Sequence, residues 1–311
     1  MMEIERSLGA RGKTIPKDEV TVVIPVLNEE GAIQKILREL KACGFDKIIV
    51  VDGGSTDRTV ELAREEVPIL FQLGKGKGDA IRTAVPHIPT EYALIMDGDH
   101  TYDPECIQRL LEQGDYFDEV VGVREKGKIP RLHRLGNWII TKTFNLLFDT
   151  DLSDVCSGMY LVRTEVLREF DFSTKGFSVE VGIAAHTAST SRRITETDIC
   201  YRERIGKPKL KSLHGFQIIL DTVRLAWSYN PAFLFFLMSS LIVVPCSLIL
   251  GWVAYRYLTY GVSHFVWAII GTVGMGVGIM SMLLSVMCLF VKRVEYRLLE
   301  RIRNGKGPGK R

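Results

Sequence analysis

The sequence predicts an α/β domain followed by two helices that could span a membrane. Short β-branched apolar runs alternate with stretches of helical periodicity through residues 20–211. Polar residues follow each of the first four apolar runs. Two stretches without charged residues then occupy 231–255 and 264–291, and each is long enough to cross a bilayer.

The first part of the domain is predicted as strands that alternate with helices. Four strands are expected, at residues 20–24, 47–51, 68–71 and 92–96. Helical stretches are expected after the first two strands, at residues 28–41 and 59–66. Pro25 should stop the first strand, and Ser55 or Thr56 can cap the second helix. Alternation with short connections predicts parallel strands and ligands bound beyond their carboxyl ends.

The fourth strand ends on Asp97 and Asp99, with only Gly98 between them. Two carboxylates at the end of a buried strand repel each other and are costly to desolvate unless a cation joins them. We expect Gly98 to let the backbone turn so that both carboxylates face one point. Such oxygen ligands suit Mg²⁺ or Mn²⁺, and these ions suit a diphosphate. The alternative for an isolated D-x-D pattern is an ordinary polar turn.

The other strand ends carry polar residues that should meet at the same edge. These are Pro25, Asn28 and Glu29 after the first strand, and Asp52, Ser55 and Asp57 after the second. The third strand is followed by GKGKGDA, which contains Lys77 and is a glycine-rich entry to a helix whose amides could face a phosphate. This segment does not complete the G-x-G-x-x-G fingerprint, and Gly12-Lys13-Thr14 lacks the upstream glycine of a P-loop.

Composition excludes several classes of protein. The net charge is only +3, so nothing in the total indicates binding to nucleic acid. The six cysteines form no C-x-x-C pair and have no metal-ligand spacing, so we expect scattered reduced thiols rather than a disulfide framework. The first residues are charged and contain no apolar segment, which argues against a signal peptide.

The segments VVIPVLNEE, VVDGGSTDRT, GKGKGDA and MDGDHTYDP, in this order, resemble family 2 glycosyltransferases of the GT-A fold. DVCSG and YRERIGKPKL narrow the resemblance to polyprenyl-phosphate glycosyltransferases, the branch that is similar to dolichyl-phosphate mannose synthase. The resemblance covers residues 20–210 and implies that Asp97 and Asp99 hold the metal and the diphosphate. The nucleotide-binding residues that we expect are Pro25, Asn28, Glu29, Asp52, Lys77, Asp97 and Arg124, with Asp52 facing the base.

The sequence departs from the family pattern at two positions. Gly53 stands where relatives often have a second aspartate, and Thr101 stands where mannose synthases supply a glutamine to the metal. The second departure argues against GDP-mannose as donor. His100 adjoins the metal pair, and we expect it to be a surface residue.

The segment that follows the strand at 120–123 is expected to serve the acceptor. Arg124 directly follows this strand, and in relatives an arginine here meets the donor diphosphate; a surface arginine is the alternative. Residues 129–148 then mix cations with Trp138 and large aliphatic residues, as in a helix at a membrane interface. By resemblance, Arg131 and Arg134 would hold the lipid phosphate. The alternative is an amphipathic helix packed on the sheet.

Asp154 and Glu180 occupy positions that are familiar from relatives. Asp154 would lie near the reaction centre, but a phosphate monoester has a second pKa of about 6 and is already ionised at neutral pH. We therefore expect Asp154 to orient groups or act electrostatically rather than as a strong base. Glu180 is expected to be structural.

The basic segment at residues 202–211 is interrupted by Gly206 and Pro208, which argue against a regular helix. We expect a mobile loop that closes over a diphosphate through Arg204 and Lys209. A solvated run of charges is the alternative.

The C-terminal part is predicted to enter the membrane. Residues 212–230 mix apolar and charged side chains, as in an interfacial helix, and the two uncharged stretches follow. Arg256 is the charged residue of their short connection, whereas eight Lys and Arg residues follow residue 291, which places both ends and the catalytic domain in the cytoplasm. Gly274 and Gly278 could pack the two helices together or build a homo-oligomer. Two buried helices of a soluble protein are the alternative.

The sequence therefore predicts an integral membrane enzyme with five parts. These are an N-terminal extension (1–19), a GT-A domain (20–211), an interfacial helix (212–230), two membrane helices (231–291) and a basic cytoplasmic tail (292–311). It would transfer a sugar with inversion from a nucleoside diphosphate sugar, UDP-glucose or UDP-N-acetylglucosamine, to dolichyl or another polyprenyl phosphate. The predicted catalytic residues are Asp99, Asp154, Arg204 and Lys209. Alternatives are a GDP-mannose-dependent synthase, a processive polysaccharide synthase and an inactive membrane adaptor.

Overall fold

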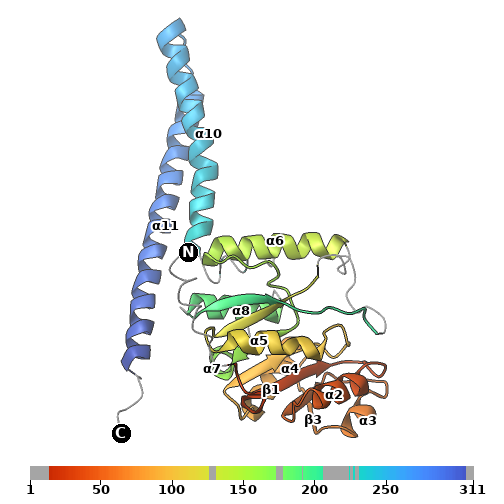
Figure 1. Cartoon of the computed structure of the whole chain (residues 1–311). Coiled ribbons are helices and arrows are strands. Elements are labelled where there is room, and N and C mark those ends of the chain that lie inside the picture. The colour runs from red at the N-terminus through yellow and green to blue at the C-terminus, as the bar shows by residue number, and fades with distance from the viewer. Residues whose placement is uncertain are drawn as a thin grey trace. The chain divides into compact units, whose positions relative to one another are not determined.

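The computed structural model divides the chain into two compact units, Met1–Thr222 and Val223–Arg311 (Figure 1). The residues that the structure describes are 14–125, 131–172, 178–190, 192–205, 224, 227 and 231–305. Within these ranges, the side chains of 131–133, 292, 295, 296 and 299–305 are not described. The first unit holds the α/β domain and the second holds the two long apolar helices.

The first unit is built on a seven-stranded mixed sheet in the order β3-β2-β1-β4-β6-β5-β7. The strands are β1 (Val20–Val26), β2 (Ile48–Asp52), β3 (Ile69–Phe71), β4 (Tyr92–Ile95), β5 (Glu119–Val123), β6 (Tyr160–Arg163) and β7 (Ile194–Asp198). The first four strands pair in parallel, as the alternating pattern predicts. β6 runs antiparallel to both of its neighbours, β4 and β5. The rule that strands joined by short helical connections run parallel does not apply to β6, because a strand and a long helix separate β4 from β6 in sequence.

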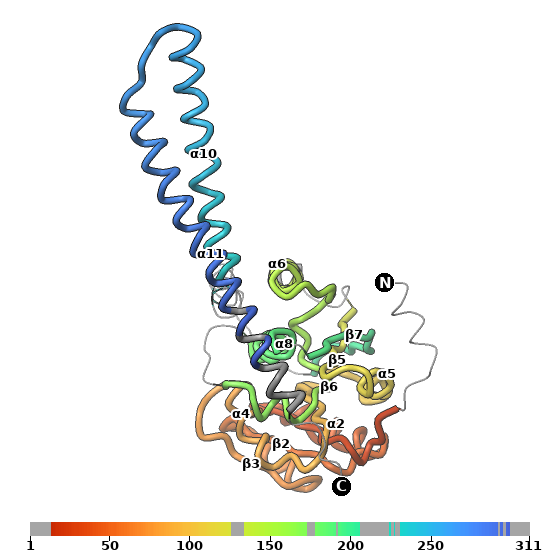
Figure 2. The backbone as a smooth tube through the Cα atoms, turned by 90° about the vertical axis from the view of Figure 1, so that its left-hand side faces the viewer, coloured from red at the N-terminus to blue at the C-terminus, as the bar shows by residue number. Residues whose placement is uncertain are grey.

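Helices cover both faces of the sheet (Figures 1 and 2). The helices of the first unit are α2 (Ile33–Ala42), α3 (Thr59–Arg64), α4 (Lys77–Ala84), α5 (Ile107–Gly114), α6 (Arg131–Phe148), α7 (Thr164–Glu169) and α8 (Val179–Ser189). Short 3-10 turns are η1 (Lys17–Glu19), η2 (Val85–His87) and η3 (Pro104–Cys106). Alternate residues of β1 enter two separate cores: Val22 packs with α2 and α5, and Val23 packs with α4, α7 and α8.

Two details of the first loops differ from expectation. β1 continues through Pro25 to Val26, because its pairing with β4 ends at Val23 and the strand has only β2 beside it beyond that point. Neither Ser55 nor Thr56 caps α3: the residue before the helix is Arg58, and Asp57 Oδ1 accepts from the Thr59 amide at 3.0 Å. Ser55 and Thr56 bond to Asn28 instead.

The second unit is an antiparallel pair of helices, α10 (Pro231–Tyr260) and α11 (Phe265–Gly305). The apolar parts, Pro231–Tyr260 and Phe265–Val291, have mean hydropathies of 2.5 and 2.1 and are long enough to cross a membrane. In each, only 11% of the most apolar window is buried, which is unlike the core helix of a soluble protein. α10 extends past residue 255, so Arg256 lies within the helix and not in the connection.

Small residues on α11 pack this hairpin on itself. A Cβ on Gly274 would overlap Cys246 Sγ, and one on Gly278 would overlap Val243. Ser239 and Ser285 add hydrogen bonds of 2.7 Å each to carbonyls of the opposite helix. Of the two roles expected for these glycines, packing within the hairpin is therefore the one observed. The predicted interfacial helix at 212–230 lies outside the described residues, apart from Arg224 and Trp227, which are helical.

Candidate active site

The carboxyl ends of β1, β2 and β4 adjoin because β1 lies between the other two strands. Val26, at the end of β1, is in register with Asp52, at the end of β2. Asp97 and Asp99 follow β4 directly. The sheet thus brings three of the expected site segments to one edge, as the pattern of polar residues predicts.

Asn28 ties together the loops that follow β1 and β2. Its backbone is in the left-handed region, with φ of 52°. Its Oδ1 accepts from the Thr56 amide at 2.7 Å, and its own amide donates to Ser55 Oγ at 2.9 Å. Asp52 is buried and accepts from the amides of Gly54 and Ser55 at 2.8 and 3.0 Å. These two expected nucleotide-binding residues therefore also hold the shape of the loops.

The glycine-rich loop presents Lys77 at the first position of α4. Gly76 precedes it with φ of 86°, which a residue with a Cβ adopts only with strain. Gly74 donates its amide to Asp79 Oδ2 at 2.6 Å, so this amide already has an acceptor within the loop. Lys77 reaches the site, where it pairs with Asp97.

Lys77 joins two carboxylates that are far apart in sequence. Its Nζ lies 2.5 Å from Asp97 Oδ1 and 2.5 Å from Glu180 Oε1, on the first turn of α8. Burial raises the pKa of Asp97, and the negative charges of Glu180 and Asp99 raise it further, although Lys77 opposes the shift. Burial alone would lower the pKa of Lys77, but the two carboxylates outweigh it and raise that pKa.

Two glycines make room for the aspartates. A Cβ on Gly98 would lie 2.7 Å from Val26 Cγ1, so close packing against β1 requires this glycine. Gly98 is not among the residues with positive φ; in this loop the left-handed residue is His100, with φ of 63°. The turn that we expected from Gly98 is therefore made at His100. A Cβ on Gly158 would overlap the Asp97 carboxylate, which is thus seated against the 154–158 loop.

Asp99 is held by hydrogen bonds on one oxygen and by an arginine on the other. Its Oδ1 accepts from the amide and hydroxyl of Thr101, at 3.1 and 2.5 Å. Its Oδ2 lies 3.1 Å from Arg204 Nη1, and Arg204 Nη2 donates to Glu29 Oε1 at 2.8 Å. Arg204 Nε is buried and has no hydrogen-bond partner among the described residues. Arg204 thus lies beside the carboxylates of Asp99 and Glu29, whereas Lys209 is outside the described residues.

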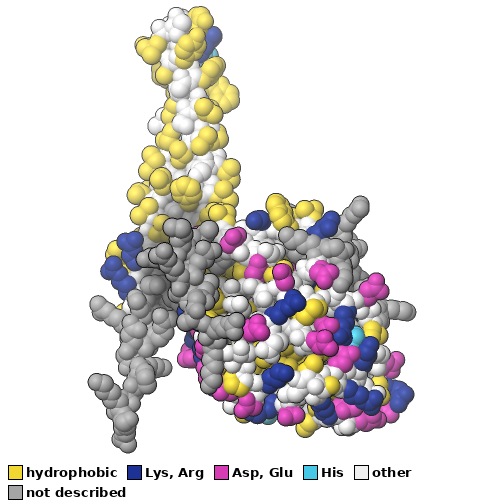
Figure 3. Space-filling model, viewed as in Figure 1, with side chains coloured by type: hydrophobic (Ala, Val, Ile, Leu, Met, Phe, Trp, Pro, Cys, Tyr) yellow, Lys and Arg dark blue, Asp and Glu magenta, His cyan; other side chains and the backbone are white. Residues whose placement is uncertain are grey.

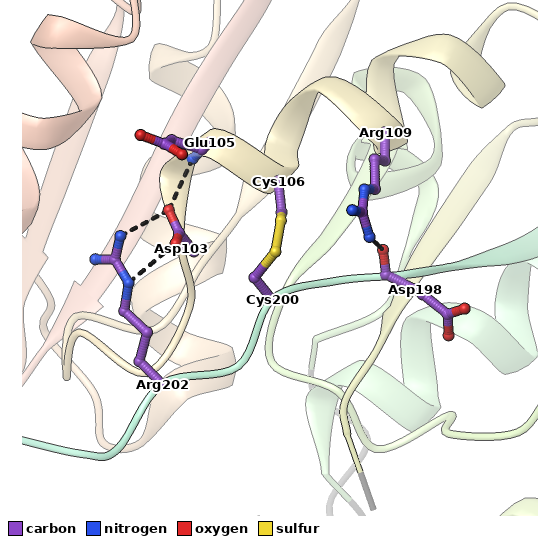
Figure 4. The surroundings of a disulfide bond; sticks show 7 residues. All are labelled: Asp103, Glu105, Cys106, Arg109, Asp198, Cys200 and Arg202. Carbon is purple, nitrogen blue, oxygen red and sulfur yellow. Dashed lines mark hydrogen bonds and ion pairs between the residues drawn. A yellow bond between two sulfur atoms is a disulfide. The ribbon is translucent and has the colours of Figure 1, made fainter.

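The segment that carries Arg204 lies along the loop that carries Asp99. The Arg202 amide donates to the Thr101 carbonyl at 2.7 Å, and Tyr201 bridges to Tyr102. A disulfide joins Cys106 to Cys200, and beside it Arg202 pairs with Asp103 at 2.7 Å (Figure 4). The prediction of scattered reduced thiols is therefore wrong for this pair. The two cysteines are 94 residues apart, so the fold rather than a local motif brings them together.

His100 is buried, with 4% of its surface exposed, so the expectation of a surface histidine is wrong. Its Nε2 lies 3.1 Å from both oxygens of Glu39 and 3.0 Å from Arg202 Nη1. Burial alone would raise the pKa of Glu39, but hydrogen bonds from His100 and Arg202 keep it below its usual value. This cluster fixes the far side of the Asp99 loop to α2.

Arg124 and Asp154 form a two-point ion pair. Arg124 Nε and Nη2 donate to the two oxygens of Asp154 at 2.7 and 2.8 Å. Both side chains are largely buried, with 13% and 7% exposed. Burial alone would lower the pKa of Arg124, but pairing with Asp154 raises it. Asp154 therefore holds Arg124 in place, which agrees with an orienting role.

α6 has one packed face and one exposed face. Phe144 and Leu147 are buried, whereas Leu135, Trp138 and Leu146 are more than half exposed. The expected packing on the domain is therefore observed for one face of α6, and the membrane interface stays a prediction for the other. Arg134 is exposed, and Arg131 begins the helix with its side chain outside the described residues.

Sequence reasoning did not find the pairing of Glu180 with Lys77. We expect a structural role for Glu180, and its side chain pairs with Lys77 beside Asp97. It lies on a helix more than one hundred residues away in sequence from Lys77, with no local pattern linking the two. Arg202 and the two disulfide cysteines were missed for the same reason.

Comparison with known proteins identifies the family. The profile of Glycosyl transferase family 2 matches residues 21–171. Glycosyltransferase AglJ of Haloferax volcanii is 30% identical over 298 residues, which cover 92% of this chain and 97% of the relative. The chain belongs to glycosyltransferase family 2. The AglJ match spans nearly all of both chains, so it extends beyond the catalytic domain.

Two further relatives match about two thirds of the chain. The dolichyl-phosphate hexose transferase of Haloferax volcanii is 33% identical and covers 64% of this chain and 89% of its own. The undecaprenyl-phosphate 4-deoxy-4-formamido-L-arabinose transferase of Edwardsiella ictaluri is 28% identical and covers 66% of each chain.

Solved structures of this glycosyltransferase fold agree with the sheet. Glucosyl-3-phosphoglycerate synthase from Mycobacterium tuberculosis, in complex with Mn²⁺, UDP-glucose and phosphoglyceric acid, has a TM-score of 0.58 at 21% identity. It covers 73% of this chain and 83% of its own. At this identity the likeness concerns the fold, and the predicted GT-A fold is confirmed.

Proposed function

We propose that this glycosyltransferase moves a sugar from a nucleoside diphosphate sugar to a polyprenyl phosphate, with inversion at the anomeric carbon. The observation that carries the proposal is the edge where Asp97 and Asp99 meet Lys77 and Arg204. Carboxylates for a metal and cations for a diphosphate are the groups that a nucleotide-sugar donor needs. The relatives named above that act on dolichyl or undecaprenyl phosphate support the choice of acceptor.

Asp97 and Asp99 would hold the metal, Mg²⁺ or Mn²⁺. No group of three or more His, Cys, Asp or Glu side chains that could hold a metal lies in the described part of the chain. A pair of carboxylates fits these ions because the donor's phosphates and water complete the coordination. Bound there, the metal would neutralise charge that develops on the leaving nucleoside diphosphate.

The loops of β1 and β2 would cradle the nucleotide. Asn28 and Asp52 organise these loops, and Glu29 fixes Arg204. Arg204 Nε is a buried donor with no partner among the described residues, and a phosphate oxygen of the donor is a suitable acceptor for it. Lys77, Arg204 and Lys209 would thus stabilise the leaving group, with Arg124 facing the diphosphate.

The acceptor phosphate would attack from the opposite side of the sugar. Its second pKa of about 6 leaves it ionised at neutral pH, so the chain need not supply a strong base. Asp154 instead orients Arg124. Arg131 and Arg134, at the start of α6, would hold the lipid phosphate, and the exposed Leu135, Trp138 and Leu146 suit the surface of a bilayer.

The donor that we favour is a UDP-sugar, either UDP-glucose or UDP-N-acetylglucosamine. The amide and the hydroxyl of Thr101 both donate to Asp99. Thr101 therefore holds the aspartate, whereas a mannose synthase would have a glutamine for the metal at this position. GDP-mannose is the alternative donor.

We place the catalytic unit in the cytoplasm, with α10 and α11 spanning the membrane. Arg293 and Arg297 follow the second span, whereas Arg256 lies near the other end of the hairpin, and the positive-inside rule favours this orientation. The Cys106–Cys200 disulfide argues the other way, because disulfides are rare in most cytosolic proteins. Labelling of a single introduced cysteine at Asp46 with a membrane-impermeant reagent would decide the orientation.

The proposal is tested by offering the purified full-length protein a panel of radiolabelled donors. UDP-glucose, UDP-N-acetylglucosamine and GDP-mannose would each be incubated with dolichyl phosphate, with Mg²⁺, with Mn²⁺ or with a chelator. We expect one labelled lipid product from a UDP-sugar, lost with the chelator. A polymeric product would favour a processive synthase. Binding of nucleotide without any transfer would count against the acceptor, and failure to bind any nucleotide would favour an adaptor.

A further inference from the structure

Lys77 is shared between a carboxylate of the candidate metal loop and a carboxylate outside it. It lies 2.5 Å from Asp97 and 2.5 Å from Glu180. The side chains of Lys77 and Glu180 are 23% and 12% exposed, so water screens this contact only in part. If Lys77 left Asp97, Glu180 would still hold it at the same edge of the site.

Arg204 bridges Asp99 and a second carboxylate, as Lys77 bridges Asp97 and Glu180. It lies 3.1 Å from Asp99 and 2.8 Å from Glu29, which is 9% exposed. Each aspartate of the D-x-D pair thus carries a basic partner, and each basic partner has a second carboxylate as an anchor. The two bridges come from unrelated elements: α4 and α8 supply one, and the loop after β1 and the segment after β7 supply the other.

The charges of the two bridges do not balance. Among the described side chains that form the two bridges, four carboxylates face two cations, which is an excess of two negative charges and equals the charge of one divalent cation. The Asp97 side chain is 34% exposed and that of Asp99 10%, so water screens this excess only in part, and further positive charge would stabilise it. The aspartates are therefore suited to a divalent cation, but their present partners compete with it.

We propose that Glu180 and Glu29 are positioning residues that retain Lys77 and Arg204 when these cations give up Asp97 and Asp99 to a metal ion. This inference rests on the proposed function. Lys77 and Arg204 then turn from the aspartates to the donor diphosphate, which becomes their new anionic partner. Glu180 holds Lys77 in place and Glu29 holds Arg204, so neither carboxylate needs to touch the donor.

The exchange makes metal and nucleotide bind cooperatively. Without nucleotide, a metal ion must displace two cations that find no new partner. With nucleotide, the displaced Lys77 and Arg204 pair with the diphosphate, so each ligand strengthens binding of the other by the same factor. We expect UDP to tighten Mn²⁺ binding to the wild type by about tenfold or more.

The test measures the dissociation constant of Mn²⁺ by electron paramagnetic resonance, with and without saturating UDP, on the full chain in detergent. The variants are Lys77→Gln, Glu180→Gln and the double variant, whose paired glutamines have similar shape and no charge. Glu66→Gln is the matched control, because Glu66 accepts from Lys41 at 2.9 Å and from Arg38 at 2.8 Å away from the site. Thermal unfolding of each variant verifies that it is folded.

We expect Lys77→Gln to bind Mn²⁺ alone about threefold to tenfold more tightly than the wild type and to gain less from UDP. Glu180→Gln should bind Mn²⁺ alone several-fold more weakly, since Lys77 then has only Asp97 as its partner. The decisive comparison is the double variant. If Glu180 acts through Lys77, adding Glu180→Gln to Lys77→Gln changes neither Mn²⁺ constant.

An equal effect of Glu180→Gln in both backgrounds would overturn the inference, because Glu180 would then act only through its own charge. Equal Mn²⁺ binding with and without UDP in the wild type would also overturn it, while leaving the proposed function intact. A wild type that binds neither Mn²⁺ nor UDP would instead overturn the proposed function. Glu66→Gln should match the wild type in both constants.

Discussion

The catalytic unit buries charged side chains, whereas the hairpin exposes apolar ones. Glu29, Asp52, Asp99, Glu119 and Asp154 are all less than 10% exposed in the first unit. In the second unit, large apolar side chains are exposed along both helices, and Figure 3 shows them covering the visible face of the hairpin. The visible face of the first unit mixes acidic and basic side chains (Figure 3).

The difference indicates the surroundings for which each unit is built. An exposed apolar surface of this extent is unfavourable in water and favourable in lipid. The hairpin therefore depends on close contact between helices, made by glycines and serines. The catalytic unit depends on buried ion pairs and a disulfide. Changes of charge should thus affect the first unit most, and changes of size the second.

The largest effect should come from Asp99→Asn. The variant keeps the size of the side chain but removes a charge that pairs with Arg204 and that would bind the metal. We expect transfer to fall by about 10³-fold, because the charge that develops on the leaving group would lose its stabilisation. The measurement is the initial rate of labelled lipid formation, and circular dichroism should show an unchanged fold.

Asp46→Asn is the control for that variant, because Asp46 is exposed and precedes the amino end of β2, whereas the site lies at the carboxyl ends of the strands. It should transfer sugar at the wild-type rate. Activity within a few-fold of wild type in Asp99→Asn would remove this carboxylate from the mechanism.

Removal of the disulfide should have the next largest effect. Replacing Cys106 and Cys200 by serine frees a loop whose ends are 94 residues apart, which should lower the free energy of unfolding by about 4 kcal/mol. Denaturant titration without reductant would measure it. Cys43→Ser, which removes a free thiol, should change little. Six reactive thiols in the unfolded, unreduced wild type would contradict the disulfide.

Glu119 should make stability depend on pH. Burial raises its pKa from 4.5 to about 8, although the Thr187 hydroxyl, which donates to it at 2.5 Å, opposes the shift. A raised carboxyl pKa means that the folded state holds its proton longer, so this contribution is present below pH 4.5 and is lost as the pH rises towards 8. We expect the loss to be on the order of 3 kcal/mol, at roughly 1.4 kcal/mol per pKa unit and with some local relaxation.

Glu119→Gln should remove this dependence, because the amide keeps the hydrogen bond and does not ionise. Urea titrations at pH 5 and pH 8 would compare the two proteins. If the wild type and the variant lose equal stability between these values, the carboxylate titrates elsewhere and the assignment is wrong.

The parts of the fold that follow from local pattern could be predicted from the sequence. Strand alternation gave the parallel half of the sheet, and the lengths of the uncharged stretches gave the hairpin. The antiparallel placement of β6 could not be predicted, because it depends on how α6 returns the chain to the sheet. The end of β1 was also misjudged, since Pro25 is tolerated where one neighbour is missing.

The candidate site divides in the same way. Asp97, Asp99 and Asn28 follow strands whose ends meet, so their proximity could be inferred from topology alone. Glu180 and the Cys106–Cys200 pair have partners about one hundred residues away in sequence, and only the folded chain brings them together. Local patterns therefore predict which residues follow the strands, but not which distant residues pair with them.

The smallest effect that we expect distinguishes packing within the hairpin from association between chains. Gly274→Ala would place a methyl group against Cys246, whereas Gly276→Ala, two residues along α11, meets no atom within 4 Å. The first should lower the stability of the hairpin in detergent by about 1 to 2 kcal/mol through overpacking. The second should leave it unchanged or raise it by at most about 1 kcal/mol, through the helix propensity of alanine. Light scattering on the same samples would report the oligomeric state. Loss of an oligomer in Gly274→Ala without loss of hairpin stability would mean that the face of Gly274 and Gly278 serves a second chain and not the hairpin itself.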